Sequence, residues 1–264
     1  MGQQAYRDSA GPGDSSGTAA IGTAQPGARS GWDLRVCSWN LWELRGDLRA
    51  ALDTIHDLDP DILLMQEAPR FVLPQARLDW FARRAGRRIL VGGRGGRGLA
   101  ILATDEVAAQ VIRRGMHPVA QQISDLNSTY PRGVAGVRLS VPGGGQLVVS
   151  SIHFALQVPN RVAHAEHVAD LVRAARCPVI VGGDLNETAD GPARSLLEPL
   201  AHDPADQDQW TFPAARPQRR IDAIMVTEGV RVRDAHAVRE TAHADRARLA
   251  TASDHLPTLL DVTV

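Results

Sequence analysis

The segment CPVIVGGDLNETADGP, residues 177–192, begins as an apolar run and ends in polar residues. The run predicts a buried strand, and Asp184 and Asn186 follow it after two glycines. Because Gly, Asp and Asn are the usual residues of β-turns, an ordinary turn is the alternative interpretation. We expect the two glycines to let the backbone turn tightly at the strand end, so that Asp184 and Asn186 face a ligand together. The remainder of the chain decides between a turn and a site.

The same arrangement recurs at the ends of other apolar runs. Asn40 follows VCSW, Glu67 follows ILLMQ and His153 follows VVSSI. In sheets of α/β proteins, ligands gather outside the carboxyl ends of the strands. Each residue alone also fits a cap, a turn or a paired surface charge, but together they predict a site. The seven candidates include one at the start of a later strand and two before the last strand, and they are Asn40, Glu67, His153, Asp184, Asp222, Asp254 and His255.

The pattern of apolar residues also predicts the domain organisation. Residues 1–31 are rich in Gly, Ser and Ala and carry almost no large apolar side chains, so we expect a disordered tail. From residue 32 to 264, the segment 48–58 predicts a helix capped by Asp47, and the runs LAILAT, VAAQVIRR, GVAGVRLSV and QLVVSSIHF predict neighbouring strands. Mixed strands and helices predict one α/β (α+β) catalytic domain with two sheets packed face to face and helices outside.

Composition excludes several classes of function. The net charge of −1 over 264 residues argues against a chain-wide electrostatic footprint for nucleic acid. All 29 basic residues are arginine, and the absence of lysine excludes a Walker P-loop and Schiff-base chemistry. No signal-peptide pattern and no apolar stretch of membrane-spanning length are present, so we expect a soluble, cytoplasmic protein. The sequence indicates no protein partner.

Three further patterns have ordinary explanations. Residues 93–98, GRGGRG, match a dinucleotide-binding motif, but a strand follows where that motif opens a helix, so a hairpin loop is favoured. His164 and His167 have no third metal ligand at matching spacing, and we expect them on a solvated helix face. Residues 253–255, SDH, are the types found in a catalytic triad, but three consecutive side chains diverge.

The types of the candidate residues limit the chemistry. Glu67 and Asp254 are hard oxygen ligands, and no cluster of Cys and His competes with them, so Mg²⁺ or Mn²⁺ is favoured over zinc. An aspartate and two histidines nearby supply a general base and hydrogen-bond donors for developing charge. Metal-assisted hydrolysis of a phosphate ester is the reaction class that uses all of these groups.

The motifs SWN, MQE, SIHF, GGDLN, TFPAARPQRRIDAIMV and SDHLP, in this order, resemble the motif set of the endonuclease/exonuclease/phosphatase superfamily. That superfamily includes pancreatic deoxyribonuclease, apurinic-site endonucleases, neutral sphingomyelinases and inositol polyphosphate phosphatases. The resemblance covers roughly residues 32–264. It implies a four-layer α/β/β/α sandwich and a Mg²⁺-dependent phosphoesterase.

The resemblance also implies roles for single residues. Glu67 resembles the main metal ligand, Asn40 the residue positioned beside it, and Asp254 a further carboxylate near the metal. Asp184 resembles the residue that orients or deprotonates the attacking water, and Asn186 one that holds a phosphate oxygen.

The remaining matches concern contacts to the phosphate. His255 resembles the donor to the scissile phosphate, oriented by Asp222. His153 occupies a second phosphate-contacting position, and Arg132 in YPRG matches a polar substrate contact.

Differences between this chain and one branch of the superfamily narrow the range of expected substrates. Apurinic-site endonucleases carry an acid where this chain has Trp42, a lysine where it has Pro69, and a tyrosine at the position of His153, so abasic-site repair is disfavoured. We therefore expect a phosphodiesterase, with a nuclease acting on DNA or RNA as one candidate. The alternatives are a phosphomonoesterase on a small or lipid phosphate and a catalytically inactive binding module. An arginine cluster could serve a nucleic acid or be only a solvated surface, and it comprises Arg83, Arg84, Arg87, Arg88, Arg94 and Arg97.

Overall fold

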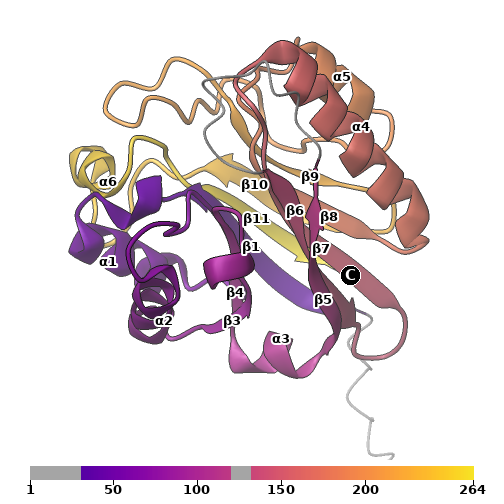
Figure 1. The fold of residues 1–264 in the computed structure, drawn as a ribbon, viewed down its shortest axis with the longest axis horizontal. Coiled ribbons are helices and arrows are strands. Elements are labelled where there is room, and N and C mark those ends of the chain that lie inside the picture. Colours follow the sequence, from indigo (N-terminus) through magenta and orange to yellow (C-terminus); the bar gives the residue numbers. More distant parts are fainter. Residues whose placement is uncertain (1–30, 120–131) are drawn as a thin grey trace, which may run out of the picture. The chain divides into compact units, whose positions relative to one another are not determined.

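Two mixed β-sheets pack face to face in the part of the chain that the computed structural model describes, residues 31–119 and 132–264 (Figure 1). The first sheet has the order β10–β11–β1–β2–β4–β3, with β1 (Asp33–Asn40), β2 (Ile62–Gln66), β3 (Arg88–Val91), β4 (Leu99–Ala103), β10 (Arg231–Ala237) and β11 (Thr258–Thr263). The second has the order β5–β6–β7–β8–β9, with β5 (Val111–Pro118), β6 (Gly133–Ser140), β7 (Gln146–His153), β8 (Val179–Asp184) and β9 (Asp222–Val226). Each sheet contains one parallel pair, β1 with β2 and β7 with β8, and its other pairs are antiparallel.

Helices cover the outer faces of both sheets. They are α1 (Leu48–Leu58), α2 (Pro74–Arg84), α4 (Val158–Ala175), α5 (Pro192–Leu197) and α6 (Arg246–Ala252). The short helix α3 (Asp105–Ala109) instead packs its Val107 in the layer between the sheets, and the chain also forms the 3₁₀ turns η1 (Trp42–Leu44) and η2 (Gly93–Gly95). Side chains of α1, α2 and α6 pack on the first sheet, and those of α4 and α5 pack on the second. The four-layer α/β/β/α sandwich expected from the sequence is therefore confirmed. None of the helices within residues 31–119 and 132–264 is both long and apolar enough to cross a membrane.

Three apolar layers form the core, and strand alternation explains them. Successive side chains of a strand point to opposite faces of its sheet. In β1, Val36 packs between the two sheets while Cys37 packs under the helices of the first sheet. In β8, Ile180 packs between the sheets while Val181 packs under α4 and α5. Both sheets thus pack apolar side chains on two faces, with one buried polar group between them in which Gln66 Nε2 donates to Ser38 Oγ and Ser151 Oγ at 3.2 and 3.1 Å.

The helix predicted from residue 48 to 58 is α1, and its start is fixed by the expected cap. The Asp47 side chain accepts hydrogen bonds from the backbone N–H groups of Arg49 and Ala50 at 2.9 and 3.1 Å. These bonds satisfy donors that a helix leaves free in its first turn. On the inner face of the helix, Ile55 and Leu58 are buried.

The strand predicted from VAAQVIRR is wrong in its first half. The chain forms helix α3 there, and strand β5 begins only at Val111. The Thr104 side chain caps this helix at the backbone N–H of Val107, and Asp105 and Glu106 lie in its first turn, where acidic groups favour the helix dipole. Local capping therefore outweighed the apolar pattern.

The two glycines of the segment 177–192 lie inside β8, so the tight turn expected at these positions is wrong. A Cβ atom on Gly182 would lie 2.6 Å from Cδ1 of Leu64 in the facing sheet. A Cβ atom on Gly183 would lie 1.9 Å from the backbone oxygen of Ile152 in β7. The glycines are required because other atoms approach the backbone closely. The chain turns only at Asn186, whose φ is +50°.

Substitution Gly183→Ala should lower the free energy of unfolding by about 1–3 kcal/mol, the usual cost of forcing extra atoms into a packed region. The matched control is Gly115→Ala in β5, because a Cβ atom there meets nothing within 4 Å. Chemical denaturation of both variants measures the difference. Equal stability of the two variants would contradict the close approach of β7 to Gly183.

The compact unit of the structure is Gly31–Val264. Apart from Gly31, the tail expected over residues 1–31 lies outside the described residues, and its disorder stays a prediction.

Candidate active site

The two parallel strand pairs end at the same place, one pair in each sheet. In the first sheet, Asn40 of β1 lies beside Gln66 of β2, so that Glu67 is the first residue after the pair. In the second sheet, His153 of β7 lies beside Asp184 of β8. The Asn40 Nδ2 donates to Asp184 Oδ2 at 3.1 Å and thereby joins the two strand ends. Apolar runs far apart in the sequence therefore deliver their terminal polar residues to one site.

Asp184 lies at the centre of these contacts. Its Oδ2 lies 3.3 Å from Nε2 of His153 and 3.8 Å from Nε2 of His255, and its Oδ1 accepts from the backbone N–H of Asn186 at 2.9 Å. Burial alone would raise the pKa of Asp184. The charges of His255 and His153 and the hydrogen bonds from His153 and Asn186 outweigh it and hold that pKa below its usual range. The carboxylate is therefore ionised at neutral pH and can accept a proton or a hydrogen bond.

His255 is held in one orientation from three sides. Asp222, at the start of β9, accepts from its Nδ1 at 2.9 and 3.1 Å. The ring of Phe212 lies 4.7 Å away, centroid to centroid, and Trp39 Nε1 donates to the His255 backbone oxygen at 2.8 Å. Burial would lower the pKa of His255, but the negative charges of Asp222 and Asp184 raise it to about 10. At neutral pH the ring is an imidazolium whose Nε2 faces Asp184.

Glu67 lies at a sharp bend after β2. Its φ is +46°, and its backbone oxygen accepts from the N–H of Glu43 at 2.7 Å. Its Oε1 lies 3.4 Å from Asn40 Nδ2. The Asn40 Oδ1 accepts from the backbone N–H of Trp42 at 3.1 Å, which turns Nδ2 toward the carboxylates of Glu67 and Asp184. Asn40 thus lies between the two acidic groups and orients both.

The residues predicted to contact the phosphate surround this centre. Arg132 is buried, and its Nη1 donates to the backbone oxygen of His153 at 3.4 Å. Burial and the charge of Arg132 lower the pKa of His153, against the opposing effect of Asp184. Asn186 is half-buried, and its Nδ2 donates to the backbone oxygen of Phe154 at 3.0 Å. Residues 130 and 131 of the YPRG motif lie outside the described residues.

Asp254 differs from the other candidates because it is exposed. Its Oδ1 lies 3.4 Å from Ser253 Oγ, and its backbone oxygen accepts from the N–H of Ala214 at 2.7 Å. Burial lowers the pKa of His255, and Asp222 and Asp184 raise it. The negative charge of Asp254 also raises that pKa, by less than these larger effects. The structure therefore places Asp254 beside the buried centre and facing solvent.

Two sets of donors in the site are suited to a cation. Ligand atoms of Asp184, Asp222 and His255 lie within 4.8 Å of one another, and this is the one such group of three found in residues 31–119 and 132–264. It does not include Glu67 or Asp254, the carboxylates that the sequence analysis assigned to the metal. The second set is the Glu67 carboxylate beside the Asn40 amide. The oxygen donors of Glu67 suit a hard divalent cation, whereas His255 would have to lose a ring proton, which its raised pKa opposes, before it could bind a metal.

Sequence reasoning missed three residues that support the site. Thr211 Oγ1 accepts from the backbone N–H of Asp222 at 3.3 Å, and Phe212 packs on the His255 ring. Ser253 Oγ donates to the backbone oxygen of Asn40 at 2.6 Å. All three belong to motifs that carry the resemblance, TFPAARPQRRID and SDH, but only the acidic and histidine residues of those motifs were assigned roles.

His164 does not lie on a solvated helix face, so that expectation is wrong. Its side chain is 2% exposed and its ring lies 6.0 Å from that of Phe154. Within the described residues, its Nε2 and that of His167 have no hydrogen-bond partner. Burial and the charge of Arg132 lower the pKa of His164 to about 4, so it is a neutral core residue.

Solved structures share this fold. An endonuclease/exonuclease/phosphatase family protein of Bacteroides thetaiotaomicron superposes on this chain with a TM-score of 0.71 at 18% sequence identity. The match covers 88% of this chain and 98% of that one. A mannosyl-6-phosphatase of B. thetaiotaomicron VPI-5482 superposes with a TM-score of 0.70 at 18% identity, and the match covers 88% of this chain and 100% of that one. Truncated TDP2 of Caenorhabditis elegans gives 0.63 at 20% identity, covering 88% and 98%. No curated protein sequence matches the chain.

The sequence itself also matches a family model. The model describes the endonuclease/exonuclease/phosphatase family and matches residues 37–255. The matched region begins in β1 and ends at His255, so it spans every strand end that contributes to the site. The resemblance stated from the motifs is confirmed, and the chain belongs to the endonuclease/exonuclease/phosphatase family.

Proposed function

We propose that this chain is a Mg²⁺-dependent phosphoesterase that hydrolyses a phosphodiester with a water molecule activated by Asp184. The observation that carries the proposal is the position of the Asp184 carboxylate, which is buried, ionised and within 4 Å of His153, His255 and Asn40. An ionised aspartate and an imidazolium that face each other supply the proton acceptor and the cationic donor that hydrolysis of a phosphate ester needs. Membership of a family of phosphate-ester hydrolases supports the same reaction class.

Glu67 would hold the cation, with Asn40 orienting its carboxylate and Asp254 close by on the exposed side. A bound Mg²⁺ or Mn²⁺ would polarise a phosphoryl oxygen and neutralise the charge that develops on it. Glu67 suits this task because one carboxylate is enough for Mg²⁺, which keeps waters and binds substrate phosphate directly. Asp184, Asp222 and His255 remain free for proton transfer and charge stabilisation.

Asp184 would take the proton of the attacking water, or orient that water by accepting its hydrogen bond. The low pKa of Asp184 keeps the carboxylate ionised, and the amides of Asn40 and Asn186 fix both of its oxygens. A base that is already ionised and already oriented loses no free energy to reorganisation in the transition state.

His255 would donate from Nε2 to the phosphate. Asp222 bonds Nδ1, so the proton on Nε2 points into the site and the positive charge faces the developing negative charge of the phosphate. Asp222 acts as a positioning residue in this scheme. His153, Asn186 and Arg132 would bind the remaining phosphate oxygens.

A panel of substrates tests the proposal. We expect release of p-nitrophenol from bis(p-nitrophenyl) phosphate with Mg²⁺, faster than from p-nitrophenyl phosphate, and none of it in excess EDTA. Inositol phosphates, lipid phosphates, mannose 6-phosphate and oligonucleotides complete the panel. Hydrolysis of none of these would contradict the proposal and leave an inactive binding module.

A phosphomonoesterase is the second candidate, and one observation favours it. A neighbour that superposes over 88% of this chain is a mannosyl-6-phosphatase. A monoester carries one more ionisable oxygen than a diester, and Arg132 and His153 offer additional donors for it. Preferential hydrolysis of mannose 6-phosphate or p-nitrophenyl phosphate over the diester would place this candidate first.

A nuclease would use the arginine-bearing loop 92–98 beside the site. The backbone N–H of Ala68, next to Glu67, donates to the Gly98 oxygen at 2.9 Å, and Arg97 Nη1 donates to the Arg132 oxygen at 3.1 Å. Arg94 is exposed on the same loop. The loop therefore lies beside the site, where its arginines would contact the backbone phosphates of a long substrate without reading its sequence.

Substitution Arg94→Ala should raise KM for an oligonucleotide. It should also lower the slope of log affinity against log salt concentration by about one unit, the effect of one lost phosphate contact. Hydrolysis of bis(p-nitrophenyl) phosphate should not change. Arg88→Ala is the matched control, because Arg88 lies beside Ala103, at the opposite end of the first sheet from Glu67. Equal effects of Arg94→Ala on the two substrates, or no effect on either, would argue against a nuclease.

A further inference from the structure

The short turn η1 contacts both residues proposed to form the cation site. Its Trp42 backbone N–H donates to Asn40 Oδ1 at 3.1 Å, and its Glu43 backbone N–H donates to the Glu67 backbone oxygen at 2.7 Å. The first bond sets the direction in which the Asn40 amide faces, and the second holds the sharp bend that carries Glu67. The conformation of this turn therefore decides how the Asn40 amide and the Glu67 carboxylate meet.

The backbone of the turn has a conformation that its residues do not favour. The φ angles of Trp42, Glu43 and Leu44 are +45°, +54° and +56°, all in the left-handed region. Glycine adopts this region freely, and asparagine and aspartate visit it occasionally, but as single residues. Such a stretch persists only where surrounding contacts impose it. Contacts outside the turn must therefore hold it.

The buried carboxylate of Glu43 makes contacts of this kind. The residue is 3% exposed, and its Oε2 accepts from Arg45 Nη2 at 2.8 Å. Its Oε1 accepts from Arg70 Nε at 2.8 Å, and Arg70 Nη2 contacts the same oxygen. Arg70 lies three residues after Glu67. Glu43 thus holds the bend from two sides, with its backbone N–H on Glu67 and its carboxylate on Arg70.

Helix α2 anchors the same turn to the first sheet. Arg77 Nη2 donates to the backbone oxygens of Glu43 and Leu44 at 2.8 and 3.4 Å. The next residue of the helix, Leu78, is buried in the apolar layer that covers the first sheet. The turn is therefore fixed at its carbonyl groups by the helix and at its acidic side chain by the loop that follows Glu67.

From this geometry we infer that Glu43 is a positioning residue for the cation site. Its carboxylate, paired with Arg70 and Arg45, imposes the left-handed turn whose backbone N–H groups orient Asn40 and Glu67. The inference rests on the proposed function, in which Glu67 holds the cation. Residues that orient metal ligands without touching the metal change metal affinity about 10- to 100-fold when they are replaced. Glu43 acts in this way, through backbone hydrogen bonds.

Titration of the full chain with Mn²⁺ in the absence of substrate tests the inference, with free Mn²⁺ measured by electron paramagnetic resonance. Glu43→Ala should weaken Mn²⁺ binding about tenfold or more. The matched control is Asp203→Ala, because the Asp203 side chain is 1% exposed and is also held by two arginines, Arg194 and Arg220. Asp203 follows His202, which pairs with β9 in the second sheet. The control should lower the melting temperature by a similar amount and leave Mn²⁺ affinity within about twofold of the wild type.

The variant Arg70→Ala separates positioning from simple electrostatics. Removal of a positive charge close to Glu67 would by itself strengthen cation binding, because like charges repel. The inference predicts the opposite, a loss of about tenfold, because the partner that holds the Glu43 carboxylate is gone. The double variant of Glu43→Ala and Arg70→Ala should lose no more affinity than Glu43→Ala alone, because the two side chains act as one unit.

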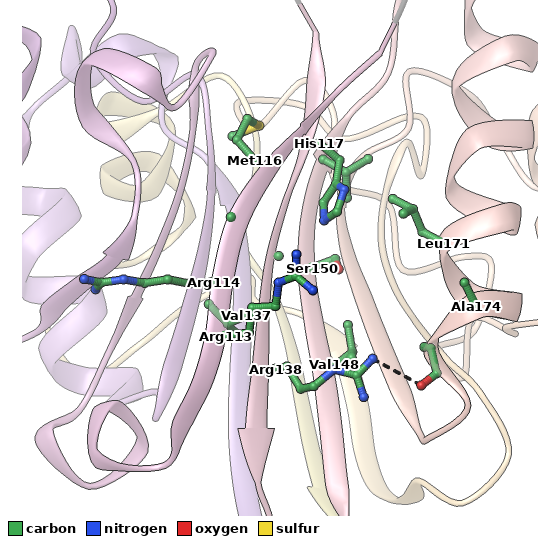
Figure 2. Close-up of a pocket in the computed structure, with 14 residues that line it drawn as sticks. Arg113, Arg114, Met116, His117, Val137, Arg138, Val148, Ser150, Leu171 and Ala174 are labelled. Carbon is green, nitrogen blue, oxygen red and sulfur yellow. Dashed lines mark hydrogen bonds between the residues drawn. The ribbon is translucent and has the colours of Figure 1, made fainter.

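The matched control for Arg70→Ala is Arg138→Ala in β6, which also removes an arginine that bridges two elements. Arg138 Nη2 donates to the Ala175 backbone oxygen at the end of α4 at 3.2 Å (Figure 2). Arg138 lies beside Val148, five residues along β7 from His153. This control should leave Mn²⁺ affinity within about twofold of the wild type.

Glu43→Gln keeps the size of the side chain and one acceptor oxygen, and it carries the same test, with a smaller loss, if Glu43→Ala does not fold. Unchanged Mn²⁺ affinity in the folded Glu43 variant, beside a loss in Glu67→Ala, would overturn this inference alone. Tighter binding by Arg70→Ala would overturn it as well, because Glu43 would then act only through its charge. Wild-type affinity in Glu67→Ala would instead overturn the proposed cation site, and the inference with it.

Discussion

Substitution His255→Ala should lower kcat for bis(p-nitrophenyl) phosphate by at least about a hundredfold, the scale of losing one positioned group that stabilises charge. The reason lies in the geometry of the ring. Asp222 bonds Nδ1, Phe212 and Trp39 hold the ring and its backbone, and Nε2 faces Asp184 at 3.8 Å. With a pKa raised to about 10, this ring is a cationic donor at any neutral pH.

The variant Asp222→Asn separates positioning from donation. Asparagine keeps the size of the side chain but removes the charge that holds the imidazolium, so kcat should fall while KM changes little. Steady-state kinetics at saturating Mg²⁺ measure both variants, and circular dichroism checks that they fold. Near-normal turnover of a folded His255→Ala protein would show that the proposed donor is wrong.

Substitution Asp184→Asn should lower kcat by a similar factor, about a hundredfold or more, because a neutral amide cannot take a proton from water. Asparagine retains an oxygen that accepts from the Asn186 backbone N–H, so the turn after β8 should keep its conformation. The measurement is single-turnover hydrolysis at saturating Mg²⁺, which isolates the chemical step from substrate binding.

A matched variant, Asn186→Ala, shows whether the loss belongs to Asp184 or to the turn. Asn186 contributes an amide to the Phe154 backbone oxygen and has a positive φ, so this variant disturbs the turn without removing the carboxylate. We expect a smaller loss than for Asp184→Asn. If the two variants lost the same activity, through the turn or through the phosphate contact proposed for Asn186, the loss could not be assigned to Asp184 as the base.

Much of the fold was readable from local sequence. The Asp47 cap and the apolar period after it predicted α1, and the ends of four apolar runs predicted where the polar residues would lie. The failures have local causes. A threonine cap made a short helix of residues 105–109, and Gly182 and Gly183 serve close packing of β8 and not a turn.

The candidate site was predictable as a set of residues but not as a network. The strand ends predicted the positions of Asn40, Glu67, His153 and Asp184, because a polar or charged group inside a buried strand costs free energy unless it is paired. That Asn40 would join both sheets through its amide depends on how the two sheets stack, which no local pattern encodes.

The central claim, that this site is a metal-dependent phosphoesterase with Glu67 as the metal residue, is tested most directly by Mg²⁺ titration of bis(p-nitrophenyl) phosphate hydrolysis. The wild type should saturate with Mg²⁺ and lose all activity in excess EDTA. Glu67→Ala should need at least about tenfold more Mg²⁺ for half-activation, the range seen when metal-site residues are removed, whereas His255→Ala should need the same concentration as the wild type. Full wild-type activity in excess EDTA, or an unchanged Mg²⁺ requirement in Glu67→Ala, would contradict the claim.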